Sequence, residues 1–288
     1  MAAGDPIVDL SDLIYLATGG GSGAPEQINF CKKSLIGGGT LGTFVAGRMS
    51  SLWQYDGFPS GAGSTNPTTS TVCTNATSGA LKQTTSATGA KKRLLSIAVA
   101  SLNVGTLIVY DRLVHTGGLS GTAAGAQTTN LPTSTLTRYT SGVGVEPWLE
   151  IYTQIGATGT TVSASYTNTT PTSGRTTPLA TWGNTGFREG QRIIPLPLQV
   201  GDRGVTSVAS VTNTATTGTA GAFGVTLAYP LIVLPLPLAG AGNMWNGMMQ
   251  AGGPLDLGAA SDACIAFSWL PNTAAVPELF GQAFFVEK

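Results

Sequence analysis

His115 is the single histidine of the 288-residue chain, and it follows Asp111 by four residues in the segment Asp-Arg-Leu-Val-His. A histidine oriented by a carboxylate is the base that activates a serine or cysteine nucleophile. The segment is largely apolar and strand-like, and on a strand these two side chains would share a face about 13 Å apart. We therefore expect no His–Asp pair, and no nucleophilic catalysis at His115.

Paired carboxylates could hydrolyse a glycoside without a histidine. The fourteen acidic residues are scattered, and besides Asp9 and Asp12 the closest pair is Glu146 and Glu150. Glu150 falls on the polar face of a predicted strand, where it could line a groove, and Trp148 on the same face is expected to be partly exposed. We therefore do not expect a carboxylate-pair hydrolase. We predict no catalytic residues and classify the protein as not an enzyme.

The cysteine spacing and the glycine runs could mark a metal site or a phosphate-binding loop. Cys31, Cys73 and Cys264 are far apart in the sequence and match no metal-binding spacing. One histidine without a cysteine cluster predicts no metal site. The glycine runs at 19–21 and 37–39 lack the lysine or helix that a phosphate-binding loop requires, so we predict turns and no cofactor. We expect three isolated thiols in a reducing compartment.

The charge and hydropathy of the chain argue against nucleic acids and membranes as partners. Charged residues make up only 10% of the chain, and fourteen basic side chains balance fourteen acidic ones. Nucleic-acid binding needs a basic surface, so we expect none. The N-terminal segment lacks the basic and apolar regions of a signal peptide. The uncharged stretch 223–242 is long enough to span a membrane, but its three prolines would break a helix, so we expect no membrane contact.

Short segments in which apolar and polar residues alternate recur between turns from Lys91 onward. A period of two residues indicates strands with one buried face, and no strand–helix–strand spacing occurs. The fold is therefore predicted to be all-β, an antiparallel β-sandwich or jelly roll. The Pro-Leu-Pro-Leu runs at 195–198 and 235–238 are expected at sheet edges, because proline lacks a backbone donor. We expect strands at 95–100, 107–114, 149–155, 161–167, 225–229, 263–269 and 279–286, with weaker candidates at 135–140, 192–200 and 205–212.

The first 90 residues follow a different pattern. Residues 1–58 contain a predicted short helix, capped by Asp9 or Ser11 and ended by three glycines. Residues 59–90 are nearly all small or polar, with little apolar area to offset ordering entropy. We predict an extended N-terminal arm (1–58), a flexible Thr/Ser/Gly-rich loop or linker (59–90) and a β-sandwich domain (91–288) that folds without them. In the alternative, a compact domain would bury the aromatic residues of the arm in its own core.

Distinctive segments run from the first helix to the last strands: Asp9-Leu10-Ser11-Asp12-Leu13-Ile14, Ala17-Thr18-Gly19-Gly20, Val45-Ala46-Gly47-Arg48, Ser51-Leu52-Trp53-Gln54-Tyr55, Tyr110-Asp111-Arg112-Leu113, Trp148-Leu149-Glu150-Ile151-Tyr152-Thr153-Gln154, Gly186-Phe187-Arg188-Glu189, Gly201-Asp202-Arg203-Gly204-Val205 and Asp262-Ala263-Cys264. Together they resemble a family of structural proteins of tailed bacteriophages, and they cover most of the chain. No segment among them is a catalytic signature.

The resemblance implies a virion component, above all a capsid decoration (cement) protein that bridges subunits of the major capsid protein and stabilises the head. Decoration proteins of this type are often trimers with a jelly-roll-like body, so we expect a homo-oligomer, with a trimer favoured. Such a protein would be made in the host bacterial cytoplasm and located on the capsid surface. The alternative is a tail or fibre component, in which exposed tryptophans could stack on carbohydrate.

The predicted attachment device is the N-terminal arm, because it combines the helix, two glycine runs and an aromatic patch. Aromatic residues that become buried at an interface typically contribute about 2 kcal/mol or more each. With so few charges, the binding should depend little on salt. The predicted interface residues are Ile14, Tyr15, Phe30, Trp53, Tyr55 and Phe58.

Overall fold

The structure, a computed structural model, describes residues 7, 9–21, 23–33, 44–59, 61–86, 89–184, 187–219, 221–247, 255–256 and 262–288. Strands account for 48% of it and helix for 5%, and the strands form three sheets in which every described pairing is antiparallel. The prediction of an all-β antiparallel sandwich is thus confirmed. The jelly-roll order of strands stays a prediction.

The largest sheet has seven strands and is built around two long neighbours. Its strands β6 and β14 are 16 and 15 residues long, so each extends over about 50 Å at about 3.3 Å per residue. The sheet consists, in spatial order, of β12 (Ile193–Pro195), β8 (Glu146–Thr153), β14 (Ala222–Leu236), β6 (Gly105–Ser120), β17 (Ile265–Pro271) and β2 (Ser50–Ser51), with β4 (Thr71–Val72) also paired to β6.

Two smaller sheets complete the sandwich. The six-stranded sheet consists of β15 (Gly242–Asn246), β5 (Lys92–Ser101), β18 (Leu279–Glu287), β1 (Glu26–Lys33) and β3 (Asp56–Phe58), with β16 (Leu255–Asp256) also paired to β5. The five-stranded sheet consists of β10 (Arg175–Thr176), β9 (Thr160–Asn168), β13 (Val205–Asn213) and β7 (Gly125–Thr128), with β11 (Ala180–Trp182) also paired to β9. A 3-10 turn, η1 (Leu131–Thr133), follows β7.

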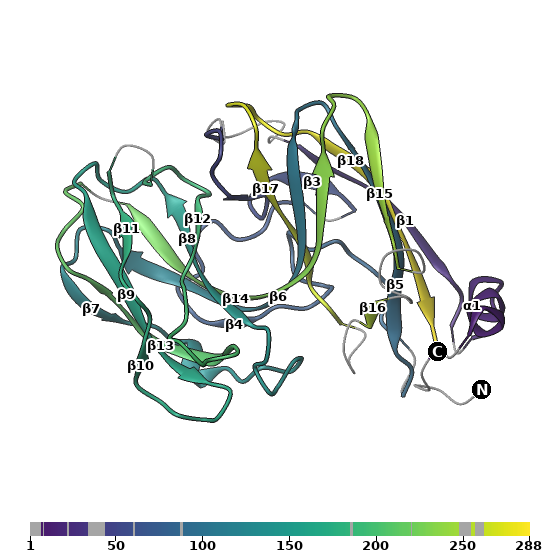
Figure 1. The fold of residues 1–288 in the computed structure, drawn as a ribbon, viewed down its shortest axis with the longest axis horizontal. Coiled ribbons are helices and arrows are strands. Elements are labelled where there is room, and N and C mark those ends of the chain that lie inside the picture. The colour runs from purple at the N-terminus through teal and green to yellow at the C-terminus, as the bar shows by residue number, and fades with distance from the viewer. Residues whose placement is uncertain are drawn as a thin grey trace.

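The two smaller sheets lie side by side along β6 and β14, so the sandwich has two hydrophobic cores (Figure 1). The six-stranded sheet packs on Leu107 and Val109 near the start of β6. The five-stranded sheet packs on Leu113 and Leu119 farther along the same strand. Because β6 and β14 belong to both cores, each core depends on strands that also support the other.

The predicted N-terminal helix is confirmed as α1 (Leu10–Ala17). The Asp9 carboxylate caps it by accepting a hydrogen bond of 2.8 Å from the backbone N–H of Asp12. The helix ends at Thr18, and Gly19 then adopts a φ of +92°, which favours glycine. Leu13 and Leu16 pack against Val286 of β18, so α1 covers one end of the six-stranded sheet.

The predicted N-terminal arm (1–58) is wrong for its described C-terminal part. Strand β1 lies inside the six-stranded sheet, where it pairs with β18 on one side and β3 on the other. Strand β2 extends the seven-stranded sheet by pairing with β17. Ile28 and Phe30 of β1 do alternate with more exposed residues, whereas the two residues of β2 are too few to show any period. The sandwich needs both strands to complete its sheets. The predicted glycine turn at 37–39 lies outside the described residues.

The predicted flexible linker (59–90) is also corrected, because most of it is held in place. Strand β4 pairs with β6, and Cys73, Ala80 and Leu81 are buried. At its end, Thr84 donates hydrogen bonds from its N–H and hydroxyl to the Glu26 carboxylate, which also accepts from Lys92 at 2.7 Å. A sandwich domain that begins at Lys91 would therefore lack strands and core residues that it needs.

The remaining strand predictions have mixed outcomes. All seven main segments contain strand residues, and 205–212 and part of 192–200 are strands too. Residues 135–140 are not a strand, and Tyr139 there has a φ of +49° and stacks on Tyr229. Pro195 lies in the edge strand β12, and Pro235 lies on a part of β14 that pairs only with β6, as expected for residues without a backbone donor.

Candidate functional site

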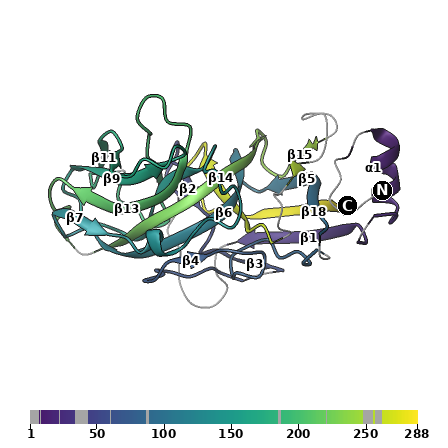
Figure 2. The ribbon, with the colours of Figure 1, turned by 90° about the horizontal axis from the view of Figure 1, so that it is seen from below.

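A segment that we call the strap (residues 44–59 and 61–84) crosses the outer face of the seven-stranded sheet. Trp53, Cys73 and Ala80 of the strap pack against the sheet side chains that point away from the two cores, among them Tyr110 and Trp148. Figure 2 shows β3 and β4 of this segment along the lower side of the molecule. The strap therefore encloses the middle of the sheet, where charged residues are concentrated.

Arg112 of β6 is the centre of this enclosed group, which we call the central polar cluster. Its guanidinium donates to the Glu150 carboxylate at 2.6 Å, to the His115 Nδ1 at 2.7 Å and to the Tyr152 hydroxyl at 3.2 Å. Thr226 of β14 donates to the same Glu150 oxygen at 2.8 Å. Arg112 is completely buried and Glu150 almost so, because β6, β8 and β14 bring these residues together beneath the strap.

The Arg112–Glu150 pair stays charged. Burial by itself raises the pKa of Glu150, but the adjacent Arg112 charge and the hydrogen bonds from Arg112 and Thr226 bring that pKa below its usual value. Burial likewise opposes the charge of Arg112, and Glu150 reverses the effect and raises its pKa. Both pKa shifts favour the charged forms, so this pair is suited to holding three strands together.

A second buried ion pair joins the strap to β17. Arg138 donates to both oxygens of Asp111, at 2.7 and 2.8 Å, and to the carbonyl oxygen of Cys73 at 2.9 Å. Asp111 also accepts a hydrogen bond of 2.9 Å from the backbone N–H of Cys264. Burial raises the pKa of Asp111, and the hydrogen bonds and charge of Arg138 offset part of that rise. Asp111 thus connects four segments without facing His115.

His115 faces a thiol and a cavity. It does not pair with Asp111, whose two oxygens are held by Arg138 and Cys264. Because Arg112 donates to Nδ1 of His115, the ring proton of the neutral imidazole lies on Nε2. The imidazole interacts electrostatically with the Cys73 thiol and lines an open cavity of about 520 Å³, whose other walls are mainly Ser, Thr and Asn side chains of the strap.

Two of the three cysteines are neighbours, which corrects the expectation of isolated thiols. Cys73 and Cys264 are both buried and belong to one cluster of packed side chains. Burial raises the pKa of the Cys73 thiol, but the hydrogen bond from Cys264, the His115 imidazole and the Arg112 charge together hold it well below its usual value. No spacing rule could have predicted that these two cysteines lie in one cluster, because most of the chain separates them.

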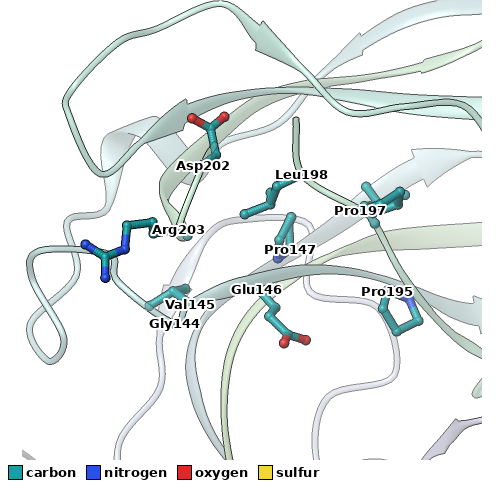
Figure 3. Close-up of a pocket in the computed structure, with 11 residues that line it drawn as sticks. Gly144, Val145, Glu146, Pro147, Pro195, Pro197, Leu198, Asp202 and Arg203 are labelled. Atoms are coloured by element: carbon teal, nitrogen blue, oxygen red, sulfur yellow. The ribbon is translucent and has the colours of Figure 1, made fainter. Parts of the chain in front are cut away.

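The acidic residues do not form a hydrolytic pair. Glu150 is buried beside Arg112 and lines no groove, and Trp148 is buried as well, so both expectations of exposure are wrong. The strap covers them. Glu146 and Asp202 contribute to a surface pocket of about 410 Å³ whose walls include three prolines and two leucines (Figure 3). Their carboxylates point in opposite directions, and Trp148 holds Glu146 at 2.8 Å while Tyr166, Asn168 and Arg175 hold Asp202.

Among the residues that the structure describes, no three His, Cys, Asp or Glu side chains come close enough to hold a metal ion. Within the same residues, no helix has the length and apolar character needed to cross a membrane.

An exposed apolar surface lies on the six-stranded sheet, on the face turned away from the core. Strand register places Phe58, Cys31, Phe280 and Ala100 side by side on four adjacent strands, and directly paired residues share a face. Phe58 and Phe280 are 64% and 46% exposed. Met244 and Ala98 form a second row, and the groove between the rows has a volume of about 640 Å³. We call these six residues the exposed apolar face.

The structure separates the predicted interface residues into two groups. Ile14, Tyr15 and Phe58 are exposed on α1 and β3. Phe30, Trp53 and Tyr55 are buried and cannot contact a partner, which corrects half of the prediction. Phe30 stacks on Phe267 at 5.1 Å, and Tyr55 packs edge-on against Phe44 at 5.2 Å. These aromatics fill the core of the compact domain, as in the alternative considered from the sequence.

Sequence reasoning missed Phe280 and Met244. A signal for Phe280 was present in the final strand, because Gln282 lies two residues away and therefore on the same face. A polar residue on one face of a strand indicates that this face meets solvent, which makes Phe280 an exposed aromatic residue. Met244 follows the least regular part of the sequence, where no periodicity indicates a strand.

The chain was compared with protein families, curated proteins and solved structures. No family model, no curated protein and no solved structure matches it.

Proposed function

We propose that the protein is a structural component of a bacteriophage virion, a capsid decoration (cement) protein that binds the major capsid protein and stabilises the head. The observation that carries the proposal is the exposed apolar face, in which Phe58 and Phe280 lie in one row across the sheet. Solvent-exposed aromatic residues in a continuous apolar row are typical of protein–protein interfaces. The resemblance of several segments to phage structural proteins is our reason for proposing the major capsid protein as the partner.

The distribution of charge also supports a binding role without catalysis. The most deeply buried charged side chains, Arg112, Glu150, Asp111 and Arg138, are bound to each other in pairs. The exposed apolar face itself has Gln282 and Asn29 as its polar neighbours. Binding at such a face relies on burial of apolar area, which salt does not screen. We propose that the protein has no enzymatic activity.

Helix α1 extends the binding surface. It packs on Val286, which lies on the same outer side of β18 as Phe280 because six residues separate them along the strand. Ile14 and Tyr15 of α1 are 56% and 49% exposed. These two predicted interface residues therefore lie on the same side of the molecule as the exposed apolar face. We propose that both α1 and this face contact the capsid.

A carbohydrate-binding tail or fibre component is less well supported. Sugar-binding platforms present aromatic rings to solvent. All five tryptophans of this chain are buried, including Trp148, which the sequence suggested to be partly exposed. The exposed aromatic residues are phenylalanine and tyrosine on the six-stranded sheet and α1.

We also propose that the protein acts as a cyclic homo-oligomer, with a trimer favoured by the resemblance. The zero net charge gives little repulsion between copies. Light scattering of the purified chain, free and bound to capsids, tests this part. A monomer in both states would refute it and leave capsid binding untouched.

The test of capsid binding uses undecorated capsids of the phage that encodes the chain. Phe280→Glu should weaken binding at least about 30-fold, the equivalent of about 2 kcal/mol at an interface hot spot. Leu179→Glu is the matched control, because Leu179 is 62% exposed on the connection between β10 and β11, away from this face. It should bind as the unchanged protein does, and binding should vary little with salt. Equal binding by Phe280→Glu and Leu179→Glu would overturn the proposal.

A further inference from the structure

The backbone brings Cys73 and Cys264 to adjacent positions along β6. Strands β4 and β17 both pair with the same edge of β6 and follow one another along it. The backbone N–H of Cys73 donates to the carbonyl oxygen of Leu113 at 2.9 Å, and the N–H of Arg112 donates to the carbonyl oxygen of Cys264 at 2.9 Å. The two cysteines thus sit opposite consecutive residues of one strand, at the junction of the strap and β17.

A further hydrogen bond holds this junction together. The backbone N–H of Asn75 donates to the carbonyl oxygen of Asp262 at 2.9 Å, which links the chain after Cys73 to the chain before Cys264. Both cysteines belong to one buried cluster with Trp53 and Tyr110. The backbone hydrogen bonds on both sides therefore keep the two thiols close together within that cluster, as formation of a disulfide requires.

We propose that Cys73 and Cys264 are a redox pair that forms an intramolecular disulfide when the protein meets a peroxide, and that this bond fastens the strap to β17. The proposal does not depend on capsid binding. It treats the pair as a modification site built into the sandwich, with His115 and Arg112 as the groups beside it.

The chemistry proceeds in two balanced steps. The Cys73 thiolate attacks hydrogen peroxide, so that an S–O bond forms, the O–O bond breaks and the leaving hydroxide takes a proton to become water. Cys264 then attacks the sulfur of the resulting sulfenic acid, the S–O bond breaks, and a second water leaves with the Cys264 proton. Two thiols are oxidised to one disulfide, and one peroxide is reduced to two waters.

The surroundings favour Cys73 as the attacking residue. Hydrogen bonds from Cys264 and His115 and the Arg112 charge favour its thiolate, whereas burial and the neighbouring Cys73 raise the pKa of Cys264 well above its usual value. His115 interacts electrostatically with Cys73 and also lines the open cavity of about 520 Å³, so this cavity is the side from which peroxide enters in the proposed reaction. Cys264 is then the resolving thiol.

The experiment treats the folded full-length chain with hydrogen peroxide, and then measures free thiols after denaturation and maps peptides without reduction. Wild type should lose two of its three thiols and yield a peptide that links Cys73 to Cys264, and dithiothreitol should restore both thiols. Cys31→Ser is the matched control and should behave in the same way. Cys73→Ser and Cys264→Ser should form no internal disulfide.

The peptide map of the unchanged protein decides the question even if a serine variant fails to fold. Recovery of Cys73 and Cys264 as free thiols, while partly exposed Cys31 is oxidised, would overturn the proposal. So would oxidation of Cys73 to a sulfinic acid without a link to Cys264. A disulfide between two chains through Cys31 would equally count against it, because the internal pair would then have been slower than a surface thiol.

Discussion

The guanidinium of Arg112 lies over the indole ring of Trp53, 4.3 Å from the ring centroid. His115 meets the same ring edge-on at 5.6 Å, so the indole closes the central polar cluster on the side of the strap. Arg112 pairs with Glu150 from the other side. Burying an ion pair costs desolvation free energy, which favourable contacts inside the protein must offset. The face of the Trp53 ring, which belongs to the strap, provides one such contact to the Arg112 charge. The strap is therefore part of the electrostatics of the sheet that it covers.

The first prediction concerns the packing of the Trp53 ring against Gly63. A methyl group on Gly63 would lie 2.3 Å from the Trp53 ring, so Gly63→Ala forces the indole away from Arg112. We expect a loss of about 1–3 kcal/mol in the free energy of unfolding, measured by urea denaturation. Gly61→Ala is the control, because its methyl group would meet Asp56 at an ordinary 3.6 Å. Similar stabilities for the two variants would contradict the close fit of the indole.

The sequence predicted the strands that obey simple periodicity. Ile265, Phe267 and Trp269 alternate with small residues, and the alternation follows directly from a sheet with one face in the core. The helix was predictable because its cap and its terminal glycine act locally. Each of these signals lies within a few residues of the element that it specifies.

The strap and the central polar cluster were not predictable in the same way. The order of the strap comes from contacts at long range, such as the bond from the Gln83 side chain to the carbonyl oxygen of Ala263. Arg138 and Asp111 are 27 residues apart and share no strand, so no spacing rule links them. One sign was available, because Asp111 and Arg112 interrupt an apolar segment, and charged residues inside a buried strand require partners.

The second prediction concerns a chain that begins at Lys91. Without β1, strand β18 loses its neighbour, and the core loses Phe30, Phe44 and Tyr55. Each large apolar side chain contributes about 1.5–3 kcal/mol when buried, against a total stability of about 5–15 kcal/mol for a typical domain. We expect this chain to be insoluble or unfolded by circular dichroism. A soluble product with a cooperative thermal transition would restore the three-part division predicted from the sequence.

The third prediction tests the Arg112–Glu150 pair. Glu150→Ala leaves a buried guanidinium without its carboxylate, which typically costs about 3–5 kcal/mol. Glu189→Ala is the control, because it removes the partner of Arg48 in a more exposed pair with an N–O distance of 3.3 Å and should cost less than about 1 kcal/mol. Chemical denaturation measures both.

A double variant refines this test. Arg112→Met with Glu150→Leu removes both charges and should recover part of the stability that Glu150→Ala loses, because no unpaired charge remains. If Glu150→Ala were no less stable than Glu189→Ala, the pair could not be the structural centre of the sheet.

The fourth prediction concerns Lys32, which is buried in β1. Its ammonium donates to the carbonyl oxygens of Tyr55 and Gly61 at 3.2 and 3.4 Å. Burial lowers its pKa from 10.5 to about 8, and the neighbouring charge of Asp56 offsets part of that effect. Between about pH 8 and 10.5 the unfolded chain therefore holds a proton on Lys32 that the folded chain has released. Stability contributed by this group must rise with pH in that window, by at most about 1.4 kcal/mol per unit.

Lys32→Met isolates the effect, because methionine does not titrate. The unfolding free energy of wild type minus that of Lys32→Met should be constant below about pH 8 and should increase from there to pH 10. Tyr55 and Tyr110, whose pKa values burial raises, lower stability above pH 10 in both proteins and so cancel in the difference. Lys33→Met, one residue along the same strand, should keep the pH dependence of wild type. A difference between wild type and Lys32→Met that stays constant from pH 7 to 10 would mean that Lys32 keeps an ordinary pKa, and that the strap leaves water around its ammonium.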